Sequence, residues 1–324
     1  MTDITFKKIQ SNGINMRLAM SGDSGPMLLL AHGWPESWYS WRHQLTGLAA
    51  AGYRVVAPDM RGYGETDAPP EVDDYDMDHL TGDMVGILDA LNEPSATIIG
   101  HDWGSPVAQF SALYYPQRFT SMVIMSVPYT GHAPRNPLET MRATFADNFF
   151  YILYHIEPGG VAERDYDRDP RGILSRLYLS PDSPREAPQI TNPKRSAGGG
   201  WIPRLGAPKG LPDWLTGEDL DYYVDQFTVS GFRGGLNYYR NIGRNWELMA
   251  DRTDFVIKVP SMFLAGEKDM VIARASKDAL QTRMEPYFTD LRNVVLFPKI
   301  GHWVQQEAPG ETNNVLLDFL KTLD

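Results

Sequence analysis

Short apolar segments alternate with amphipathic helical patterns over the first 130 residues of the chain. The segments with the composition of strands are Thr5–Ile9, Met16–Met20, Met27–Ala31, Arg54–Pro58, Thr97–Gly100 and Ser121–Ser126. The segments with helical spacing of apolar residues are Ser37–Ala51, Asp76–Leu91 and Gly104–Tyr115. Residues 28–30 are continuously apolar, which is typical of a strand buried on both faces. The alternation predicts an α/β fold with a mostly parallel, doubly wound sheet.

The pattern changes between about residues 131 and 250, where strand signals vanish and aromatic residues, proline and glycine accumulate. Strand patterns return at Ser261–Ala265 and Val294–Phe297, and a closing helix is expected near Gly310–Leu323. We therefore predict a core made of residues 1–130 and 251–324, with a helical cap inserted at residues 131–250. A separate domain on a linker is the alternative, but the late return of strands favours an insertion. Residues 180–215 are loop-like, and the sequence leaves open whether residues 185–215 are ordered.

Composition excludes several classes of function. The net charge of −11 argues against binding to nucleic acid or to an anionic membrane surface. The chain has no cysteine, so it has no disulfide, no thiolate zinc site and no cysteine nucleophile. No signal-peptide pattern and no run of about 18 apolar residues is present, so we expect a cytoplasmic protein. The seven histidines are dispersed without metal-ligand spacing, and we expect neither a metal nor another cofactor.

The segment Gly100-His101-Asp102-Trp103-Gly104 lies between a predicted strand and a predicted helix. This is the setting of a nucleophile elbow, whose usual pattern is G-x-S-x-G. Here Asp102 takes the place of the serine. A carboxylate can displace a leaving group from a saturated carbon and form an alkyl ester. The predicted reaction is therefore hydrolysis at an sp³ carbon, such as opening an epoxide or expelling a halide.

A nucleophile at an elbow needs a base and an acid that orients the base, and these follow it in the order acid, then histidine. Asp269 lies in the loop after the strand pattern that ends at Ala265, and His302 lies in a Gly-His-Trp loop after the last strand. The order Asp102, Asp269, His302 therefore fits a catalytic triad. Glu267 is a competing candidate for the acid.

A second loop, His32-Gly33-Trp34-Pro35-Glu36, follows the strand that ends at Ala31. Gly33 allows a close turn and Pro35 restricts the residue before it. We expect a cis Trp34–Pro35 peptide that directs the Trp34 backbone N–H into the site. The Trp103 N–H is the natural second donor of an oxyanion hole.

Together these motifs, with Arg61-Gly62-Tyr63-Gly64, resemble the soluble epoxide hydrolases of the α/β-hydrolase superfamily along essentially the whole chain. The resemblance implies an α/β-hydrolase fold with a helical cap. It also implies ring-opening tyrosines at Tyr151, in Tyr-Ile-Leu-Tyr-His-Ile-Glu-Pro-Gly, and at Tyr239, in Ser-Gly-Phe-Arg-Gly-Gly-Leu-Asn-Tyr-Tyr-Arg-Asn. Their neighbours Tyr154 and Tyr238 are the alternative assignments.

Phenols suit this role because an epoxide leaves as a strongly basic alkoxide, whereas a phenol with a pKa of about 10 stays protonated at neutral pH. The resemblance also implies that Glu36 and His101 support the hydrolytic water or its protons, although local hydrogen bonding is an equal alternative. We further expect an apolar substrate pocket, built from Trp103, Phe149, Phe150, Tyr154 and Trp303.

The sequence thus predicts an epoxide hydrolase that acts on small apolar epoxides through an alkyl ester on Asp102. A haloalkane dehalogenase shares the aspartate nucleophile, but the two tyrosine motifs disfavour it. A fluoroacetate-type dehalogenase would need arginines beside Asp102, and none is adjacent. A catalytically silent ligand receptor on the same fold is a further alternative, which the complete triad disfavours. The sequence does not distinguish a monomer from a homodimer.

Overall fold

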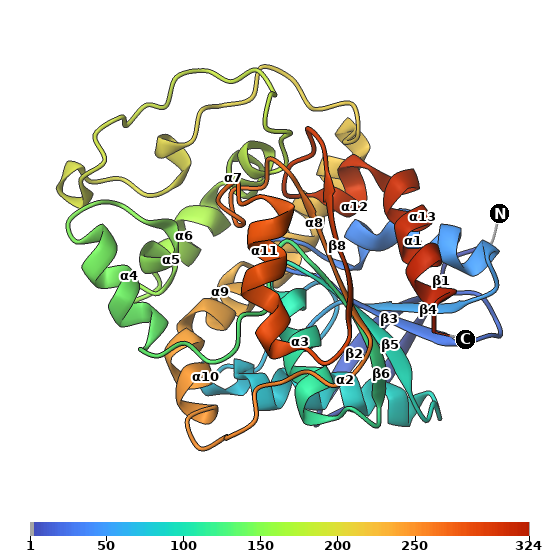
Figure 1. Cartoon of the computed structure of the whole chain (residues 1–324). Helices are drawn as coiled ribbons and strands as arrows, with labels where there is room; N and C mark the ends of the chain where they lie inside the picture. The colour runs from blue at the N-terminus through green and yellow to red at the C-terminus, as the bar shows by residue number, and fades with distance from the viewer. Residues whose placement is uncertain (1–2, 324) are drawn as a thin grey trace.

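The computed structural model describes residues 3–323, whose strands form a single eight-stranded sheet in the order β1-β2-β4-β3-β5-β6-β7-β8 (Figure 1). The strands are β1 (Thr5–Ser11), β2 (Ile14–Ser21), β3 (Met27–Ala31), β4 (Arg54–Pro58), β5 (Ala96–His101), β6 (Phe119–Met125), β7 (Ser261–Gly266) and β8 (Leu291–Phe297). All pairs from β4 onward in this order are parallel, whereas β1–β2 and β2–β4 are antiparallel. The α/β fold and all eight predicted strands are therefore confirmed.

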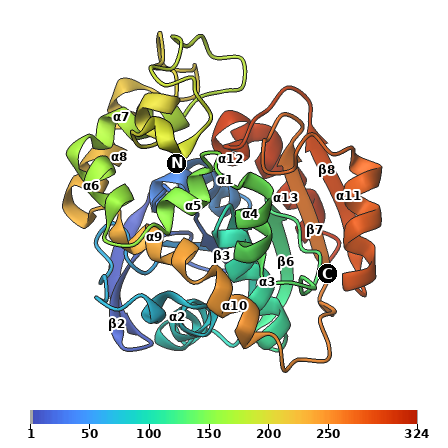
Figure 2. The same ribbon diagram turned by 90° about the vertical axis from the view of Figure 1, so that its left-hand side faces the viewer.

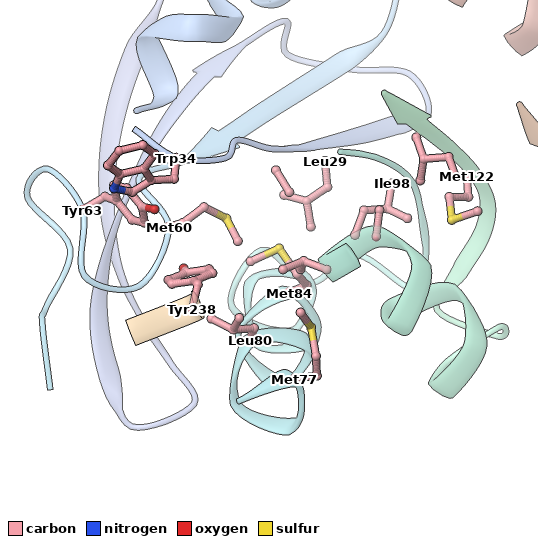
Figure 3. Close-up of a cluster of buried hydrophobic side chains, with 14 of the residues drawn as sticks. Leu29, Trp34, Met60, Tyr63, Met77, Leu80, Met84, Ile98, Met122 and Tyr238 are labelled. Carbon is pink, nitrogen blue, oxygen red and sulfur yellow. The ribbon is translucent and has the colours of Figure 1, made fainter. Parts of the chain in front are cut away.

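Helices of the core cover both faces of the sheet. They are α1 (Arg42–Ala50), α2 (Met77–Ala90), α3 (Gly104–Tyr114), α11 (Lys277–Met284), α12 (Val304–Glu307) and α13 (Pro309–Leu320). The short 3₁₀ turns of the core are η1 (Trp38–Trp41), η2 (Asp73–Tyr75) and η5 (Glu285–Tyr287). Successive strand residues point to opposite faces, so Leu29 packs in one apolar cluster and its neighbours Leu28 and Leu30 pack in the other. Figure 3 shows Leu29 and Ile98 directed toward Met84 of α2.

The predicted helix over 37–51 is wrong at its start, where the chain forms a 3₁₀ turn over Trp38–Trp41 before α1 begins. The Ser37 side chain accepts a hydrogen bond from Tyr39 N and caps this turn. Helix α11 has no counterpart among the predicted elements.

A helical segment is inserted between β6 and β7, as expected. Its helices are α4 (Pro137–Phe145), α5 (Tyr151–His155), α6 (Val161–Arg168), α7 (Pro170–Leu177), α8 (Gly217–Ser230), α9 (Arg233–Arg240) and α10 (Ile242–Leu248). Two 3₁₀ turns, η3 (Arg195–Ala197) and η4 (Ile202–Arg204), interrupt the long loop between α7 and α8. Helices α4, α5, α6, α9 and α10 lie to the left of the sheet in Figure 1, and Figure 2 shows them facing the viewer. Within residues 3–323, no helix has both the length and the apolar composition to cross a membrane.

The inserted segment is attached to the core through the loop that follows β4. Tyr238 of α9 donates a hydrogen bond to the Arg61 carbonyl at 3.0 Å, and its ring lies 5.6 Å from that of Tyr63 (Figure 3). The Arg61 guanidinium in turn makes two hydrogen bonds to Asp83 of α2, at 2.8 and 2.6 Å. Both side chains of this ion pair are buried. The loop thereby connects α2, the sheet and α9.

We expect Asp83→Asn to lower the free energy of unfolding by about 3–5 kcal/mol, because it leaves the Arg61 charge buried without a counter-charge. Chemical denaturation followed by circular dichroism measures this change. The matched control is Asp89→Asn, since Asp89 also binds an arginine, Arg118, but is 64% exposed. The control is expected to cost less than about 1 kcal/mol. Equal effects of the two substitutions would contradict this account of the loop.

Candidate active site

Asp102 lies at the turn between β5 and α3. Its φ of 49° is in the left-handed region, which residues other than glycine seldom adopt. The flanking glycines are required by close backbone contacts. A Cβ on Gly100 would lie 2.0 Å from the Gly104 carbonyl oxygen, and a Cβ on Gly104 would lie 1.9 Å from the Ala31 carbonyl oxygen. The strand–turn–helix elbow predicted from the sequence is therefore present, and it projects the Asp102 side chain from the carboxyl end of the sheet.

The loop after β3 provides a backbone donor to Asp102. The Trp34–Pro35 peptide is cis, as expected. The Trp34 N–H donates to Asp102 Oδ1 at 2.8 Å. Gly33 makes this approach possible, because a Cβ there would lie 2.5 Å from Asp102 Oδ1 and 2.7 Å from Trp103 N. The Trp34 and Trp103 backbone nitrogens thus lie on the side of Asp102 that faces Gly33.

The structure brings His302 and Asp269 together with Asp102, the three residues predicted to form a triad. His302 Nε2 lies 3.5 Å from Asp102 Oδ2, and His302 Nδ1 lies 3.0 Å from Asp269 Oδ2. The second oxygen of Asp269 accepts a hydrogen bond from Val271 N at 2.8 Å, so this buried carboxylate is held on both sides. The competing acid, Glu267, has an exposed side chain, and the structure supports Asp269 as the partner of His302.

The triad residues shift one another's protonation. Burial alone would raise the pKa of the Asp269 carboxyl, but the charge of His302 and hydrogen bonds, including that from Val271 N, hold it below its ordinary value. Burial alone would lower the pKa of His302, but the Asp269 charge and hydrogen bonds to Asp269 and Asp102 raise it well above 6.5. With both carboxylates charged, His302 is therefore held as an imidazolium.

The two tyrosines implied by the family resemblance lie close together above the elbow. Tyr151 begins α5 and Tyr239 lies in α9, and their ring centroids are 6.3 Å apart. The Tyr239 ring packs edge-on against Trp103 at 5.1 Å and against Trp34 at 5.8 Å. Burial, followed by the negative charge of Asp102, raises the pKa of both phenols above the ordinary value of tyrosine. Both therefore remain proton donors at neutral and moderately alkaline pH.

The alternative tyrosines have other partners. The Tyr154 phenol hydrogen-bonds to Asp165 of α6, and Tyr238 donates to the Arg61 carbonyl. Both side chains are buried. Since their hydroxyl groups are already engaged away from Asp102, Tyr151 and Tyr239 are the better candidates for substrate contact.

Glu36 and His101 form a buried network behind the triad. Glu36 Oε1 accepts hydrogen bonds from Gly33 N at 2.9 Å and from His101 Nδ1 at 2.7 Å. The other ring nitrogen, His101 Nε2, lies 2.8 Å from the His302 carbonyl oxygen. Burial would raise the pKa of Glu36, but the nearby His101 outweighs it and the pKa is lowered. This network links the Gly33 loop to the backbone of His302.

The residues expected to form the substrate pocket are divided between two places. Trp103 lies at the elbow, beside Tyr239. Trp303 is buried beside His302, where its indole N–H donates to the Leu177 carbonyl at 2.9 Å. Phe149, Phe150 and Tyr154 instead line a pocket of about 420 Å³ in the inserted segment, and no triad residue lines this pocket. Phe149 and Phe150 directly precede α5 and Tyr154 lies in it, and the role of these three residues in substrate binding stays a prediction.

Two residues near the tyrosines were missed in the sequence. The fully buried His155 ring contacts Tyr239 at 4.6 Å, Trp34 at 4.6 Å and Tyr151 at 5.4 Å. Burial, reinforced by Arg240, lowers its pKa well below 6.5, so the imidazole is neutral. Trp201 reaches the Tyr151 ring from the long loop. The sequence signal that could have identified Trp201 is its position as a large aromatic residue directly after three glycines.

Among residues 3–323 there is no group of three or more acidic, histidine or cysteine side chains arranged to hold a metal ion. The acidic and histidine side chains of the site instead bind one another. Asp102 and Asp269 flank His302, and Glu36 binds His101.

Comparison with known proteins identifies the family. A family model described as the alpha/beta hydrolase fold matches residues 26–309. Epoxide hydrolase A from Mycobacterium tuberculosis is 41% identical over 322 residues, covering 99% of this chain and 98% of the relative. Bifunctional epoxide hydrolase 2 from Sus scrofa is 37% identical over 96% of this chain, which matches 54% of the larger pig protein. The crystal structure of epoxide hydrolase A from Mycobacterium thermoresistibile superposes with a TM-score of 0.90 at 43% identity, covering 98% of both chains.

The chain therefore belongs to the α/β-hydrolase superfamily and, within it, to the epoxide hydrolase family.

We expect Gly33→Ala to lower kcat/KM for an epoxide by about 100-fold or more, because the new methyl group would displace the Asp102 carboxylate from the Trp34 N–H. Steady-state kinetics measure the loss, and circular dichroism checks the fold. Gly210→Ala is the matched control, since a Cβ there meets nothing within 4 Å. Full activity of the Gly33 variant would show that the close approach of this loop to Asp102 is dispensable.

Proposed function

We propose that this enzyme converts epoxides and water to vicinal diols through a covalent alkyl ester on Asp102. The observation that carries the proposal is the environment of one carboxylate. Asp102 Oδ1 is held by the Trp34 N–H, while Oδ2 faces His302, and two phenols lie above the elbow. The alkyl ester explains why a carboxylate occupies the position that a serine takes in acyl-transfer enzymes.

In the first half-reaction, Asp102 Oδ2 attacks a ring carbon of the epoxide. A carbon–oxygen ester bond forms as the ring carbon–oxygen bond breaks, and the electron pair passes to the epoxide oxygen. Tyr151 and Tyr239 donate hydrogen bonds to this oxygen, and one of them transfers its proton. The raised pKa values of the two phenols support this role, because a phenol that resists ionisation is still protonated when substrate arrives.

In the second half-reaction, water attacks Cγ of the Asp102 ester while His302 accepts one of its protons. Negative charge develops on Oδ1, the oxygen that already accepts the Trp34 N–H, and the Trp103 N–H is the proposed second donor. Collapse of this intermediate expels the diol oxygen, which takes the proton from His302. The other proton of the water remains on the restored Asp102 carboxyl group and passes to His302, which regenerates the resting carboxylate and imidazolium.

Formation of the ester itself prepares His302 to act as a base. Asp102 contributes to raising the pKa of His302 in the resting enzyme. Esterification removes the charge of Asp102, so the pKa of His302 falls between the two half-reactions. The imidazole can then give its proton to the tyrosinate left by ring opening, and the neutral ring can accept a proton from water. Asp269 and the network of Glu36 and His101 are proposed to hold this imidazole and its backbone in position.

The inserted segment serves as the cap in this proposal, because α5 and α9 contribute the two phenols. The proposed division is a core of residues 1–130 and 251–324 and a cap of residues 131–250. A dehalogenase is disfavoured because a departing halide needs no proton, whereas an alkoxide needs the donors that Tyr151 and Tyr239 provide. A cytoplasmic location, also expected from the sequence, stays a prediction.

Tyr151→Phe and Tyr239→Phe should each slow ester formation, and the double substitution should slow it by about 10²–10⁴-fold. One remaining phenol still stabilises the alkoxide, but none leaves a poor leaving group. Rapid quenching followed by intact-protein mass spectrometry measures the rate of ester formation. Tyr154→Phe is the control, because this phenol binds Asp165. Wild-type ester formation in the double variant would exclude these tyrosines as the acids.

His302→Gln should form the ester at Asp102 but hydrolyse it slowly, because alkylation needs only the carboxylate whereas hydrolysis needs a base. Mass spectrometry of the protein after exposure to styrene oxide should show an adduct of one substrate mass on the peptide that contains Asp102. Asp102→Asn is the control and should show none. An inactive His302 variant without an adduct would contradict a covalent intermediate.

Acid should slow the two half-reactions unequally. As pH falls through the pKa of His302 in the ester form, the imidazole becomes protonated and ester hydrolysis should decrease. Ester formation does not use His302 as a base, so its rate should stay constant over the same range. Single-turnover experiments between pH 5 and 9 separate the two rates. A parallel decrease of both rates would contradict the assignment of His302 to the second step alone.

A further inference from the structure

The long loop of residues 178–216, between α7 and α8, is held in a defined shape although it contains only two 3₁₀ turns. Arg204 organises it by donating hydrogen bonds to the carbonyl oxygens of Asn192, Lys194 and Gly198 at 2.6, 3.1 and 3.0 Å. The same guanidinium lies 4.5 Å from the centroid of the Phe149 ring. Arg204 therefore fixes residues 192–204 to one another and to the segment before α5.

Backbone hydrogen bonds attach the same part of the loop to that segment. Phe149 N donates to the Pro193 carbonyl at 2.7 Å, and Arg195 N donates to the Asp147 carbonyl at 2.8 Å. Helix α5 starts two residues after Phe149, with Tyr151. The loop is thus anchored immediately beside one of the two proposed ring-opening tyrosines. In Figures 1 and 2 it forms the outer edge of the inserted segment.

This anchoring places Trp201 against the site. Its ring stacks on the Tyr151 ring at 4.7 Å with an interplanar angle of 14°, and on the Trp34 ring at 6.0 Å and 16°. It also contacts the buried His155 ring at 5.4 Å. Trp201 therefore bridges the oxyanion-hole loop of the core and the tyrosine helix of the inserted segment.

The pocket of about 420 Å³ lies beside this stack and away from the triad. Phe150 and Gly200 both line it, and their next neighbours along the chain are the stacked residues Tyr151 and Trp201. The rest of the lining combines the apolar or aromatic side chains of Phe149, Tyr154 and Val161 with the charged side chains of Glu157, Asp165 and Arg195. Its volume is within the range of small-molecule sites. The two stacked rings thus adjoin the pocket lining through their chain neighbours, while Trp201 also contacts Trp34, whose N–H binds Asp102.

We propose that Trp201 determines substrate specificity by closing the catalytic site and separating it from this second pocket, so that epoxides with short substituents are preferred. The inference rests on the proposed function for the location of the reacting carbon. Removing the indole joins the catalytic site to the second pocket. A long apolar substituent can then extend into the pocket, toward Phe149 and Phe150. The loss also leaves Tyr151 without its stacking partner, which should slow ring opening for short substrates.

The test compares styrene oxide with 4-hexylstyrene oxide, which has the same reacting carbons and a long chain on the far side of the ring. In Trp201→Ala, the ratio of kcat/KM for the hexyl substrate to that for styrene oxide should rise by at least about tenfold, mainly through a lower KM for the hexyl substrate. Trp201→Phe keeps a smaller ring and should give an intermediate ratio. Arg204→Ala should shift the ratio in the same direction, because it releases the loop.

Filling the second pocket provides the decisive control. Val161→Phe adds a ring to the lining without contact to the triad. In the Trp201→Ala background it should cancel the gain for the hexyl substrate, whereas alone it should leave styrene oxide turnover unchanged. An unchanged ratio in Trp201→Ala, or a gain that survives Val161→Phe, would overturn the proposal. Adduct formation at Asp102 in the His302→Gln background tests the proposed function separately.

Discussion

The hydrogen bond from the Trp34 N–H to Asp102 Oδ1 is the interaction on which the rest of the site depends. It joins the loop after β3 to the elbow after β5, two neighbouring parallel strands whose carboxyl ends lie at one edge of the sheet. The two carboxylate oxygens of Asp102 therefore have different surroundings. Oδ1 accepts a hydrogen bond from the backbone, whereas Oδ2 faces His302. A carboxylate fixed in this way can act as a nucleophile through one oxygen and receive oxyanion stabilisation at the other.

In the proposed mechanism, electrostatics allow one histidine, His302, to serve only the second half-reaction. In the resting enzyme, Asp269 and Asp102 raise the pKa of His302 and keep it charged, so it does not compete with Asp102 for the epoxide carbon. Formation of the proposed ester would remove one of these two charges. The step that binds the substrate covalently would therefore also produce the base that hydrolyses the ester. Phenols with raised pKa values complete this division, since they donate rather than accept protons.

The sequence was sufficient to predict those parts of the site that depend on short segments. The elbow, the Gly33 loop and the order of Asp102, Asp269 and His302 follow from chain neighbours and from the strands that precede them. The positions of Phe149, Phe150 and Tyr154 could not be predicted in the same way. Tyr154 turns to Asp165, a partner on another helix, and Trp201 reaches Tyr151 only because Arg204 shapes the loop between α7 and α8. Such long-range contacts leave no local pattern.

The most direct test of the covalent mechanism follows the oxygen atoms. In a single turnover with excess enzyme in ¹⁸O-water, the oxygen added to the diol should come from the Asp102 carboxylate and be unlabelled. The ¹⁸O should appear in the peptide that contains Asp102, because water restores the carboxylate by attacking its carbonyl carbon. If Asp102 only activated water as a general base, the diol would be labelled at once and the peptide would stay unlabelled, which would contradict the account.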